Sequence, residues 1–406
     1  MQKKLIALAV AGLVSGAAFA QTNVTVYGSM DYGYQYSKSS SNEDAKGAKV
    51  DGATFSGIEA GMRNGNRVGF RGTEALGNGL NAVFQAEFGF KGDVTGGLNN
   101  TRNAWLGLQH AKFGAATLGR QNSVTYDWVS KGFASDVTVV YPSNQLQGLF
   151  NQFHTSDRVD SSVKYVSPNF GGFTFATVYG FGEKVGAQTS YAADGVTKFS
   201  TDADTADAGR FTIGANYNNG PLDLALIYGK IASDDGLRGV TGASVDNGSA
   251  GWSFGGSYDF KVVKVFGQYQ REHNELAKAT PVVTKVAGGV GSTDVAIKTG
   301  NTWAAQDDTK TLWTVGVTVP VTKAGKVIVE YVNIDVDYDA AGVKNGEGKG
   351  WGVGYEHQFS KRTVGYAAVA RTSMDNLTAK DKGFGAVQTG VDSNITSFGV
   401  GLRHTF

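Results

Sequence analysis

LDLALIYG, at residues 222–229, places large apolar side chains and small or polar ones at alternate positions. The apolar set is Leu222, Leu224, Leu226 and Tyr228, and the other set is Asp223, Ala225 and Gly229. Such alternation is typical of a β-strand with one apolar and one polar face. The same pattern follows residue 23 and recurs over 397–406, and no long window shows helical periodicity. The sequence therefore predicts an all-β fold.

The composition agrees with this prediction and excludes several classes of protein. The 406 residues include 58 glycines, 5 prolines and no cysteine, and the formal net charge is +1. Glycine at about 14% is roughly twice the usual share, with too little proline for a disordered chain. The near-zero charge argues against a nucleic-acid partner, because neutralising phosphates requires a basic surface. Without cysteine there are no disulfides, thiolate metal sites or cysteine nucleophiles.

The first twenty residues, MQKKLIALAVAGLVSGAAFA, have the three parts of a secretory signal peptide. Lys3 and Lys4 form the positive region, residues 5–14 are apolar, and Ala18-Phe19-Ala20 has the small-x-small pattern of a cleavage site. An anchoring helix would need about 20 apolar residues, and this stretch is shorter. We expect residues 1–20 to be removed on export and residues 21–406 to form one transmembrane β-barrel domain.

Short and long connections between the expected strands alternate along the chain. The short ones lie near 77–79, 112–114, 168–171, 218–221, 259–262, 320–325 and 360–362. The long ones run roughly over 37–65, 92–101, 122–157, 186–207, 233–248, 274–308, 337–348 and 373–393. Together they join 16 antiparallel strands, with short turns at one rim and long loops at the other, as in outer-membrane barrels.

A soluble β-sandwich or propeller is the alternative to a barrel. Neither a linker-like shift in composition nor a repeat of about 40–45 residues is present. The 17 tyrosines and 6 tryptophans also suffice for two interfacial girdles. We therefore predict a 16-stranded antiparallel transmembrane β-barrel with short periplasmic turns and long external loops.

Several segments resemble one known family. They are NRVGFRGTE (66–74), LGNGL (76–80), WLGL (105–108), LGRQ (118–121) and KYVSPNFGGF (164–173). Together they resemble the Gram-negative general porins, of the type found in β-proteobacteria. This resemblance implies a homotrimeric, water-filled channel in the lipid of the outer membrane, with the third long loop folded inward. The C-terminal Phe406 resembles the terminal aromatic residue that the barrel assembly machinery reads as its assembly signal.

The third long connection, 122–157, supports inward folding independently of the resemblance. It carries Tyr126, Trp128, Phe133, Tyr141, Phe150 and Phe153, whereas the equally long stretch 274–308 has only Trp303. A freely solvated loop should not expose so many large apolar groups, and the lumen wall offers a surface on which they can pack. The alternative is that they form an external protein-contact surface.

Basic residues near this loop are candidates for a pore constriction. Arg67, Arg120 and Arg158 match positions of the arginine cluster in the general porins. Alternation directs Arg67 and Arg158 toward the lumen. For Arg158 this assumes that its neighbour Val159 faces outward. Arg120 shares the parity of the apolar Leu118, so its inward placement requires the chain to turn there.

Acidic and further basic residues complete the expected pore. Asp127 and Asp136 lie on the inward loop and would face the arginines across the aperture. Arg71, Lys164, Asp31 and Arg102 are expected to line the lumen, although Arg102 has the parity of apolar neighbours. Because guanidinium stays charged and fixed charge in a narrow passage selects ions by sign, we expect a weak-to-moderate anion preference. Asp31, together with Ser29 where some relatives carry lysine, would limit that preference.

The expected function is passive diffusion of ions and small hydrophilic solutes. The alternatives are a substrate-selective channel for an anionic nutrient, or a hydrolase or adhesin that uses the barrel as a scaffold. The five histidines have no metal-ligand spacing, and no serine, histidine and acid set suggests a nucleophile. We therefore expect no enzyme activity, no metal site and no cofactor. The acidic stretches 202–204 and 234–235 are interpreted as solvated loop tips rather than as a calcium site.

Overall fold

The computed structural model of the chain describes most of the predicted strands. The described residues are 23–39, 54–92, 100–133, 158–181, 209–231, 248–274, 308–338, 345–375 and 393–406. The short pieces 42–43, 49–50, 52, 97–98, 188–191, 198–201, 284–286 and 295–297 are described as well. The segment expected to be a signal peptide and the acidic stretches 202–204 and 234–235 lie outside them.

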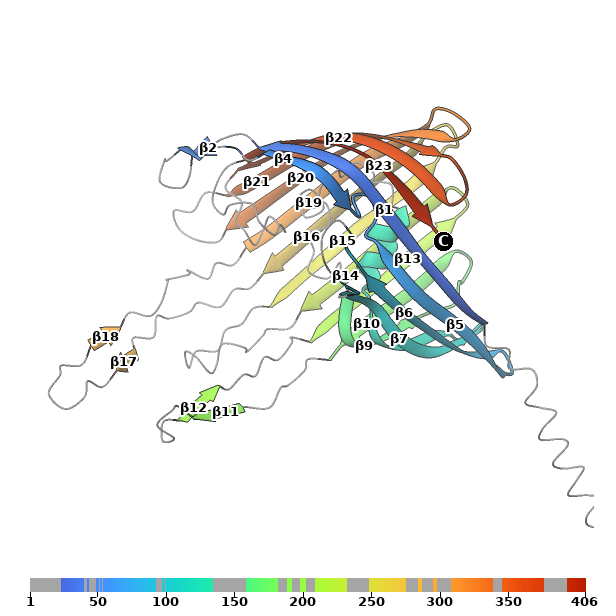
Figure 1. The fold of residues 1–406 in the computed structure, drawn as a ribbon. Helices are drawn as coiled ribbons and strands as arrows, with labels where there is room; N and C mark the ends of the chain where they lie inside the picture. The colour runs from blue at the N-terminus through green and yellow to red at the C-terminus, as the bar shows by residue number, and fades with distance from the viewer. Residues whose placement is uncertain are drawn as a thin grey trace, which may run out of the picture.

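One antiparallel sheet closes on itself into a barrel (Figure 1). Its strands are β1 (Asn23–Ser39), β4 (Thr54–Ala60), β5 (Arg67–Gly77), β6 (Leu80–Gly89), β7 (Asn100–His110), β8 (Gly114–Asn122), β9 (Arg158–Val166), β10 (Phe173–Gly180), β13 (Arg210–Asn219), β14 (Leu222–Ile231), β15 (Ser249–Asp259), β16 (Lys264–Asn274), β19 (Asp308–Pro320), β20 (Gly325–Tyr338), β21 (Gly346–Gln358), β22 (Thr363–Asp375) and β23 (Ser393–Thr405). Three small hairpins, β2 (Asn42–Glu43) with β3 (Lys49–Val50), β11 (Gln188–Tyr191) with β12 (Lys198–Thr201), and β17 (Thr284–Val286) with β18 (Val295–Ile297), lie in the long connections.

The sheet has 17 strand segments, but two of them are parts of one barrel strand. β4 and β5 pair with successive parts of the same edge of β1, and the other edge pairs with β23. The barrel therefore has 16 strands, which confirms the predicted number. The predicted first long connection, 37–65, is wrong in its extent, because Thr54–Ala60 forms a strand paired with β1.

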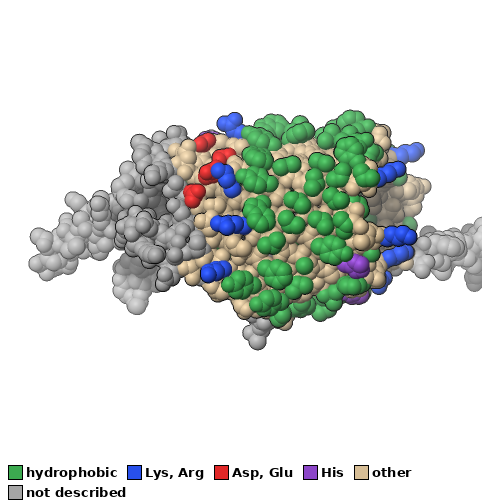
Figure 2. All heavy atoms as spheres, turned by 90° about the horizontal axis from the view of Figure 1, so that it is seen from above, with side chains coloured by type: hydrophobic (Ala, Val, Ile, Leu, Met, Phe, Trp, Pro, Cys, Tyr) green, Lys and Arg blue, Asp and Glu red, His purple; other side chains and the backbone are tan. Residues whose placement is uncertain are grey.

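The two faces of the wall have opposite character. Large apolar side chains are exposed on the outer face, among them Leu106, Leu118, Leu226, Trp252, Phe254, Val315 and Val400. Polar side chains are buried on the inner face, among them Gln35, Glu87, Gln268, Gln270, Lys310 and Thr372. Figure 2 shows the hydrophobic side chains in a central band of the outer face, with charged side chains toward both ends. An apolar band outside and a polar lining inside are what a transmembrane barrel requires.

No helix in the described part of the chain is long and apolar enough to cross a membrane.

The C-terminal residue completes the closure of the barrel. Phe406 and Gly28 exchange both backbone hydrogen bonds, at 3.0 and 3.1 Å, next to the pairing of Ser29 with Thr405. The aromatic ring of Phe406 lies against Gly28, in the space that a β-carbon there would fill. The last residue is therefore part of the seam between the first and last strands.

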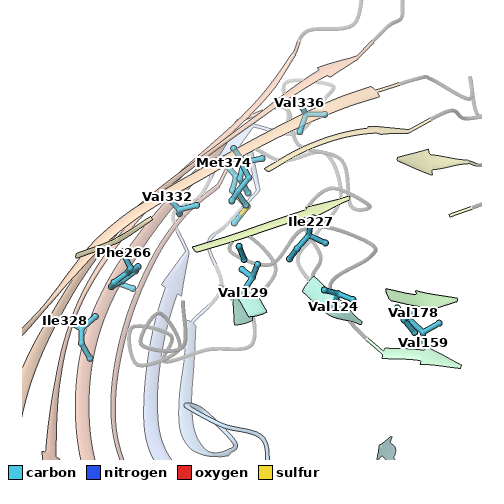
Figure 3. Packing of buried hydrophobic residues seen from close by; sticks show 14 of the residues in the cluster. Val124, Val129, Val159, Val178, Ile227, Phe266, Ile328, Val332, Val336 and Met374 are labelled. Atoms are coloured by element: carbon cyan, nitrogen blue, oxygen red, sulfur yellow. The ribbon is translucent and has the colours of Figure 1, made fainter. Parts of the chain in front are cut away.

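Part of the lumen is filled by an apolar cluster rather than by polar side chains. Val124 and Val129, from the connection after β8, are buried against inward-facing residues of the wall, including Val178, Ile227 and Met374 (Figure 3). These wall residues belong to β10, β14 and β22, so the connection enters the barrel.

Candidate pore constriction

The third long connection folds into the lumen. It begins with the helical segment η2 (Tyr126–Phe133), which contacts β14 and β15. Trp128 packs against the apolar cluster and lies on Gly214 of β13, where a β-carbon would come within 2.8 Å of Cζ3 of the indole. The absence of a side chain at Gly214 thus makes room for the loop. The predicted infolded loop is confirmed over 123–133, and Asp136 lies outside the described residues.

An ion pair fixes the start of this loop to the wall. Lys164 Nζ lies 2.5 Å from Asp127 Oδ2 and donates to the Asn122 carbonyl oxygen at 3.0 Å. Asn122 Nδ2 donates to the other carboxylate oxygen of Asp127 at 2.8 Å. Lys164 does point inward, as predicted, but its charge is used to hold the loop. Asp127 pairs with Lys164 rather than facing the arginines.

Three arginines gather around one tyrosine of the loop. The guanidinium of Arg158 lies 5.2 Å from the centre of the Tyr126 ring, and its Nη2 is 3.5 Å from the hydroxyl oxygen. Arg102 also forms a hydrogen bond with Tyr126. Arg67 lies within electrostatic range of Arg102, Arg158 and Tyr126. Cations over an aromatic face are attracted by its quadrupole, so Tyr126 offsets part of the repulsion among them.

One carboxylate, Glu87 on β6, connects this cluster to the wall. Its Oε1 lies 2.5 Å from Arg102 Nε and 3.9 Å from Arg67 Nη1, and its Oε2 accepts the Tyr27 hydroxyl at 3.0 Å. The Tyr27 ring in turn lies 5.3 Å below the guanidinium of Arg71. Arg71 lines the lumen, as predicted, beside the cluster rather than within it.

A bulge turns Arg102 inward against its parity. Ala86 pairs with Ala104, but Phe88 pairs with Thr101, so β7 carries one residue more than β6 between these pairs. Such a bulge re-aims the side chains that flank it. Arg102 therefore lies on the lumen side of β7 because of a bulge, which strict alternation does not predict.

The structure does not bring Arg120 into the cluster, which corrects its predicted place in the constriction. Arg120 lies on the face of β8 that carries the exposed Leu118, and its guanidinium pairs with Asp160 and the Thr101 carbonyl oxygen. The bulge at this level lies in β9, where Gly119 pairs with Ser162 and Gln121 with Val159. Because β8 has no extra residue there, Arg120 keeps the parity of Leu118.

The same bulge changes the argument for Arg158. Val159 was expected to face outward, yet it is buried in the luminal apolar cluster. Ser161, with φ at 44°, marks the irregular position. Arg158 still reaches Tyr126, because it is the first residue of β9, where the chain enters the sheet after the third long connection. The contact with Tyr126 thus does not depend on the parity argument, which fails because Val159 faces inward.

Asp31 faces the lumen, as predicted, but it is fully buried. Its carboxylate accepts hydrogen bonds from the Arg63 and Asn64 backbone N–H groups and from the Tyr366 hydroxyl. A permeating ion therefore meets little of its charge directly.

Four residues of the site were missed by the sequence reasoning. Glu87 had a usable signal, since it shares the parity of Gln85 and opposes Phe84 and Phe88. Tyr126 was noted only as one of the loop aromatics. Tyr27 also had a signal, since it shares the parity of the inward-facing Asp31 and Gln35, whereas Arg63 had none in the alternation because its role depends on a contact with a distant strand.

The described site carries an excess of positive charge beside a narrowed passage. Arg67, Arg102 and Arg158 contribute three cations, and Glu87 pairs with Arg67 and Arg102. All three arginine side chains approach the inward loop from the same stretch of wall, β5, β7 and β9. Such an arrangement attracts anions at short range and repels cations.

Comparison with known proteins gives the family. The model of the Gram-negative porin family matches residues 7–377. Outer membrane porin proteins of Bordetella pertussis and Delftia acidovorans are 32% and 31% identical to the chain, with 100% of each chain covered in both cases. The solved anion-selective porin from Comamonas acidovorans has a TM-score of 0.66 at 26% identity, covering 95% of this chain and 100% of that one.

This chain belongs to the Gram-negative porin family. It is an outer-membrane porin, a β-barrel channel of a Gram-negative bacterium, as the resemblance implied.

Proposed function

We propose that the barrel lets ions and small hydrophilic solutes diffuse through an aperture with a weak-to-moderate preference for anions. The observation that carries this proposal is the convergence of Arg67, Arg102 and Arg158 on Tyr126, with Glu87 paired to Arg67 and Arg102. The anion selectivity of the Comamonas acidovorans porin, to which this chain is similar, supports it. In this proposal the chain has no enzyme activity, and selectivity follows from fixed charge alone.

Planar-bilayer recording under a salt gradient tests this function. Ohmic current steps are expected, and the reversal potential should have the sign of an anion-preferring channel. A cation-preferring potential would overturn the proposed selectivity, and a bilayer-inserted protein that passes no current would overturn the channel. Saturation of the current by one anionic nutrient would favour the alternative, a substrate-selective channel.

We also propose that the native assembly is a homotrimer in the outer-membrane lipid. A solved outer-membrane neighbour from Vibrio cholerae is described as a trimer form, although at 16% identity it supports the fold alone. Conductance steps in groups of three, and a band of three chain masses on an unheated denaturing gel, are the expected results.

Export and assembly complete the proposal. Residues 1–20 act as a cleaved signal peptide, and Phe406 acts as the signal for the barrel assembly machinery. The pairing of Phe406 with Gly28 gives this last residue a structural role as well. Mass spectrometry of the purified protein should give an N-terminus at Gln21, and deletion of Phe406 should lower the yield of assembled barrel.

A further inference from the structure

The second barrel strand is interrupted between β4 and β5. β1 pairs Tyr32 with Ala60 and Ser29 with Arg67, so only two residues of β1 stand opposite the six residues 61–66. Regular antiparallel strands match one residue with one. The segment thus carries four surplus residues, more than the single extra residue of an ordinary bulge. These residues must leave the plane of the sheet.

The surplus residues lie on the lumen side of the wall. Met62 is buried, and its sulfur lies 2.6 Å from the place of a β-carbon on Gly33. Gly33 has the same parity as Asp31 and Gln35, which are buried on the inner face of β1. The missing side chain at Gly33 therefore makes room for the segment inside the barrel.

Asp31 holds the segment at both ends and in the middle. Its Oδ2 accepts the backbone N–H groups of Arg63 at 3.0 Å and Asn64 at 2.7 Å. Its carbonyl oxygen accepts the Gly61 N–H at 2.7 Å, and its own N–H donates to Asn66 Oδ1 at 2.7 Å. A buried carboxylate is costly unless it is hydrogen-bonded, and here the segment supplies those bonds.

The segment in turn places two luminal arginines. Arg63 pairs with Glu356 on β21, which also lies 3.2 Å from Lys326 Nζ. Arg67 Nε donates to the Gly65 carbonyl oxygen at 3.0 Å, and its Nη2 donates to Asn64 Oδ1. Hydrogen bonds to residues 61–66 therefore orient the Arg67 side chain in the aperture.

The segment also reaches a second arginine of the aperture. A β-carbon on Gly65 would lie 3.6 Å from Arg102 Nη1. Residues 61–66 thus connect the Arg63–Glu356 pair to the cluster around Tyr126.

We propose that residues 61–66 are a second constriction element beside the inward loop, and that Asp31 is the positioning residue that holds it in place. This inference rests on the proposed function, because its test measures the ionic current through the lumen and so requires that the barrel conducts ions. It differs from the sequence-based expectation for Asp31, in which its charge limits anion preference directly.

Comparison of Asp31→Ala with Asp31→Asn separates position from charge. Both variants remove one negative charge, but the asparagine keeps an oxygen that accepts the Arg63 and Asn64 N–H groups. Asp31→Asn should keep the wild-type conductance, with an anion-to-cation permeability ratio equal to or above that of the wild type. Asp31→Ala should change the conductance and lower the ratio by about tenfold for each arginine displaced, because a unit charge about 6 Å from an ion in water favours an anion and disfavours a cation by about threefold each.

The outcomes distinguish this inference from the proposed function. Equal conductances and equal upward shifts of the ratio in both variants would mean that Asp31 acts only as a charge, and the positioning role would be overturned. A wild type without anion preference would overturn the proposed selectivity, while a difference in conductance between the variants would still support the second constriction element.

A cysteine probe tests the segment without changing Asp31. The chain contains no cysteine, so Gly65→Cys provides a unique thiol. A charged, membrane-impermeant thiol reagent should lower the current through Gly65→Cys and leave Val400→Cys, on the apolar outer face, unchanged. An unchanged current with mass-confirmed labelling of Gly65→Cys would show that the segment lies outside the ion path, which overturns the proposal.

Discussion

Trp128 and Gly214 are in contact inside the barrel, with the indole lying where a β-carbon on Gly214 would come within 2.8 Å. The contact joins the inward loop to β13, two strands along the sheet from β9, which carries Lys164 of the Lys164–Asp127 ion pair. Two neighbouring residues of the helical segment, Asp127 and Trp128, thus fix the loop to two different strands of the wall. A substitution of Gly214 should therefore change the position of the loop, although Gly214 itself need not contact a permeating ion.

Gly214→Ala tests this contact. The added methyl group collides with Trp128 and also meets Ile227 Cγ1 at 3.0 Å, so the loop should shift away from the wall. Overpacking of this kind costs about 1–3 kcal/mol, which should lower the unfolding temperature and change the single-channel conductance. Gly350→Ala is the matched control, because its nearest neighbours are methyl groups of Val332 and Thr372, which belong to wall strands and not to the loop. Equal conductances in the two variants would contradict the contact.

Arg158→Glu should move the reversal potential toward cation preference. A unit charge about 6 Å from an ion in water contributes ~0.7 kcal/mol, and this substitution changes two charges. Because the energies of the anion and the cation change in opposite directions, the permeability ratio should fall by about a hundredfold. The measurement is the reversal potential under a salt gradient, repeated at high salt, where screening should reduce the effect. Arg120→Glu is the control, since Arg120 pairs with Asp160 outside the cluster. No shift for Arg158→Glu would remove Arg158 from the aperture.

Glu87→Gln should strengthen anion preference. The amide keeps the shape of the side chain and the acceptor for Arg102, but it removes the counter-charge of Arg67 and Arg102. The permeability ratio should rise by about tenfold, because removal of one negative charge favours the anion and disfavours the cation by about threefold each. A ratio at or below that of the wild type would show that Glu87 lies too deep in the wall to influence the ion path.

Leu226→Arg tests the apolar outer face. Leu226 is 47% exposed although it lies in the middle of β14, which is expected only if lipid covers it. A cation near the bilayer midplane should lower the free energy of unfolding by about 2–4 kcal/mol. Leu226→Met is the control, and denaturant unfolding of the barrel in lipid vesicles is the measurement. An arginine variant as stable as the methionine variant would place this face in contact with water.

Much of the fold could be predicted because the signals are local. Alternation around Leu226 gives the two faces of β14, and tight turns such as 77–79, where Gly77, Asn78 and Gly79 all have positive φ, mark the short rim. The extent of the first long connection was wrong, because the pairing of β4 with β1 joins residues across a loop. No local pattern reports that pairing.

The site was less predictable than the fold, for a physical reason. Bulges in β7 and β9 shift alternation by one residue, and this shift turns Arg102 inward and buries Val159. A single sequence gives no sign of where such a shift falls. Arg67, which lies directly after the interruption of its strand, kept its predicted direction.

The interruption at residues 61–66 allows the width of the passage to vary independently of the circumference of the barrel. Strand number and stagger fix the width of a closed barrel, so a uniform wall could narrow only by changing its whole circumference. Here β4 and β5 keep their register with β1 on either side of the surplus residues. Natural variation or protein engineering can therefore lengthen, shorten or recharge this segment and retune permeation, while the lipid-facing cylinder stays as it is.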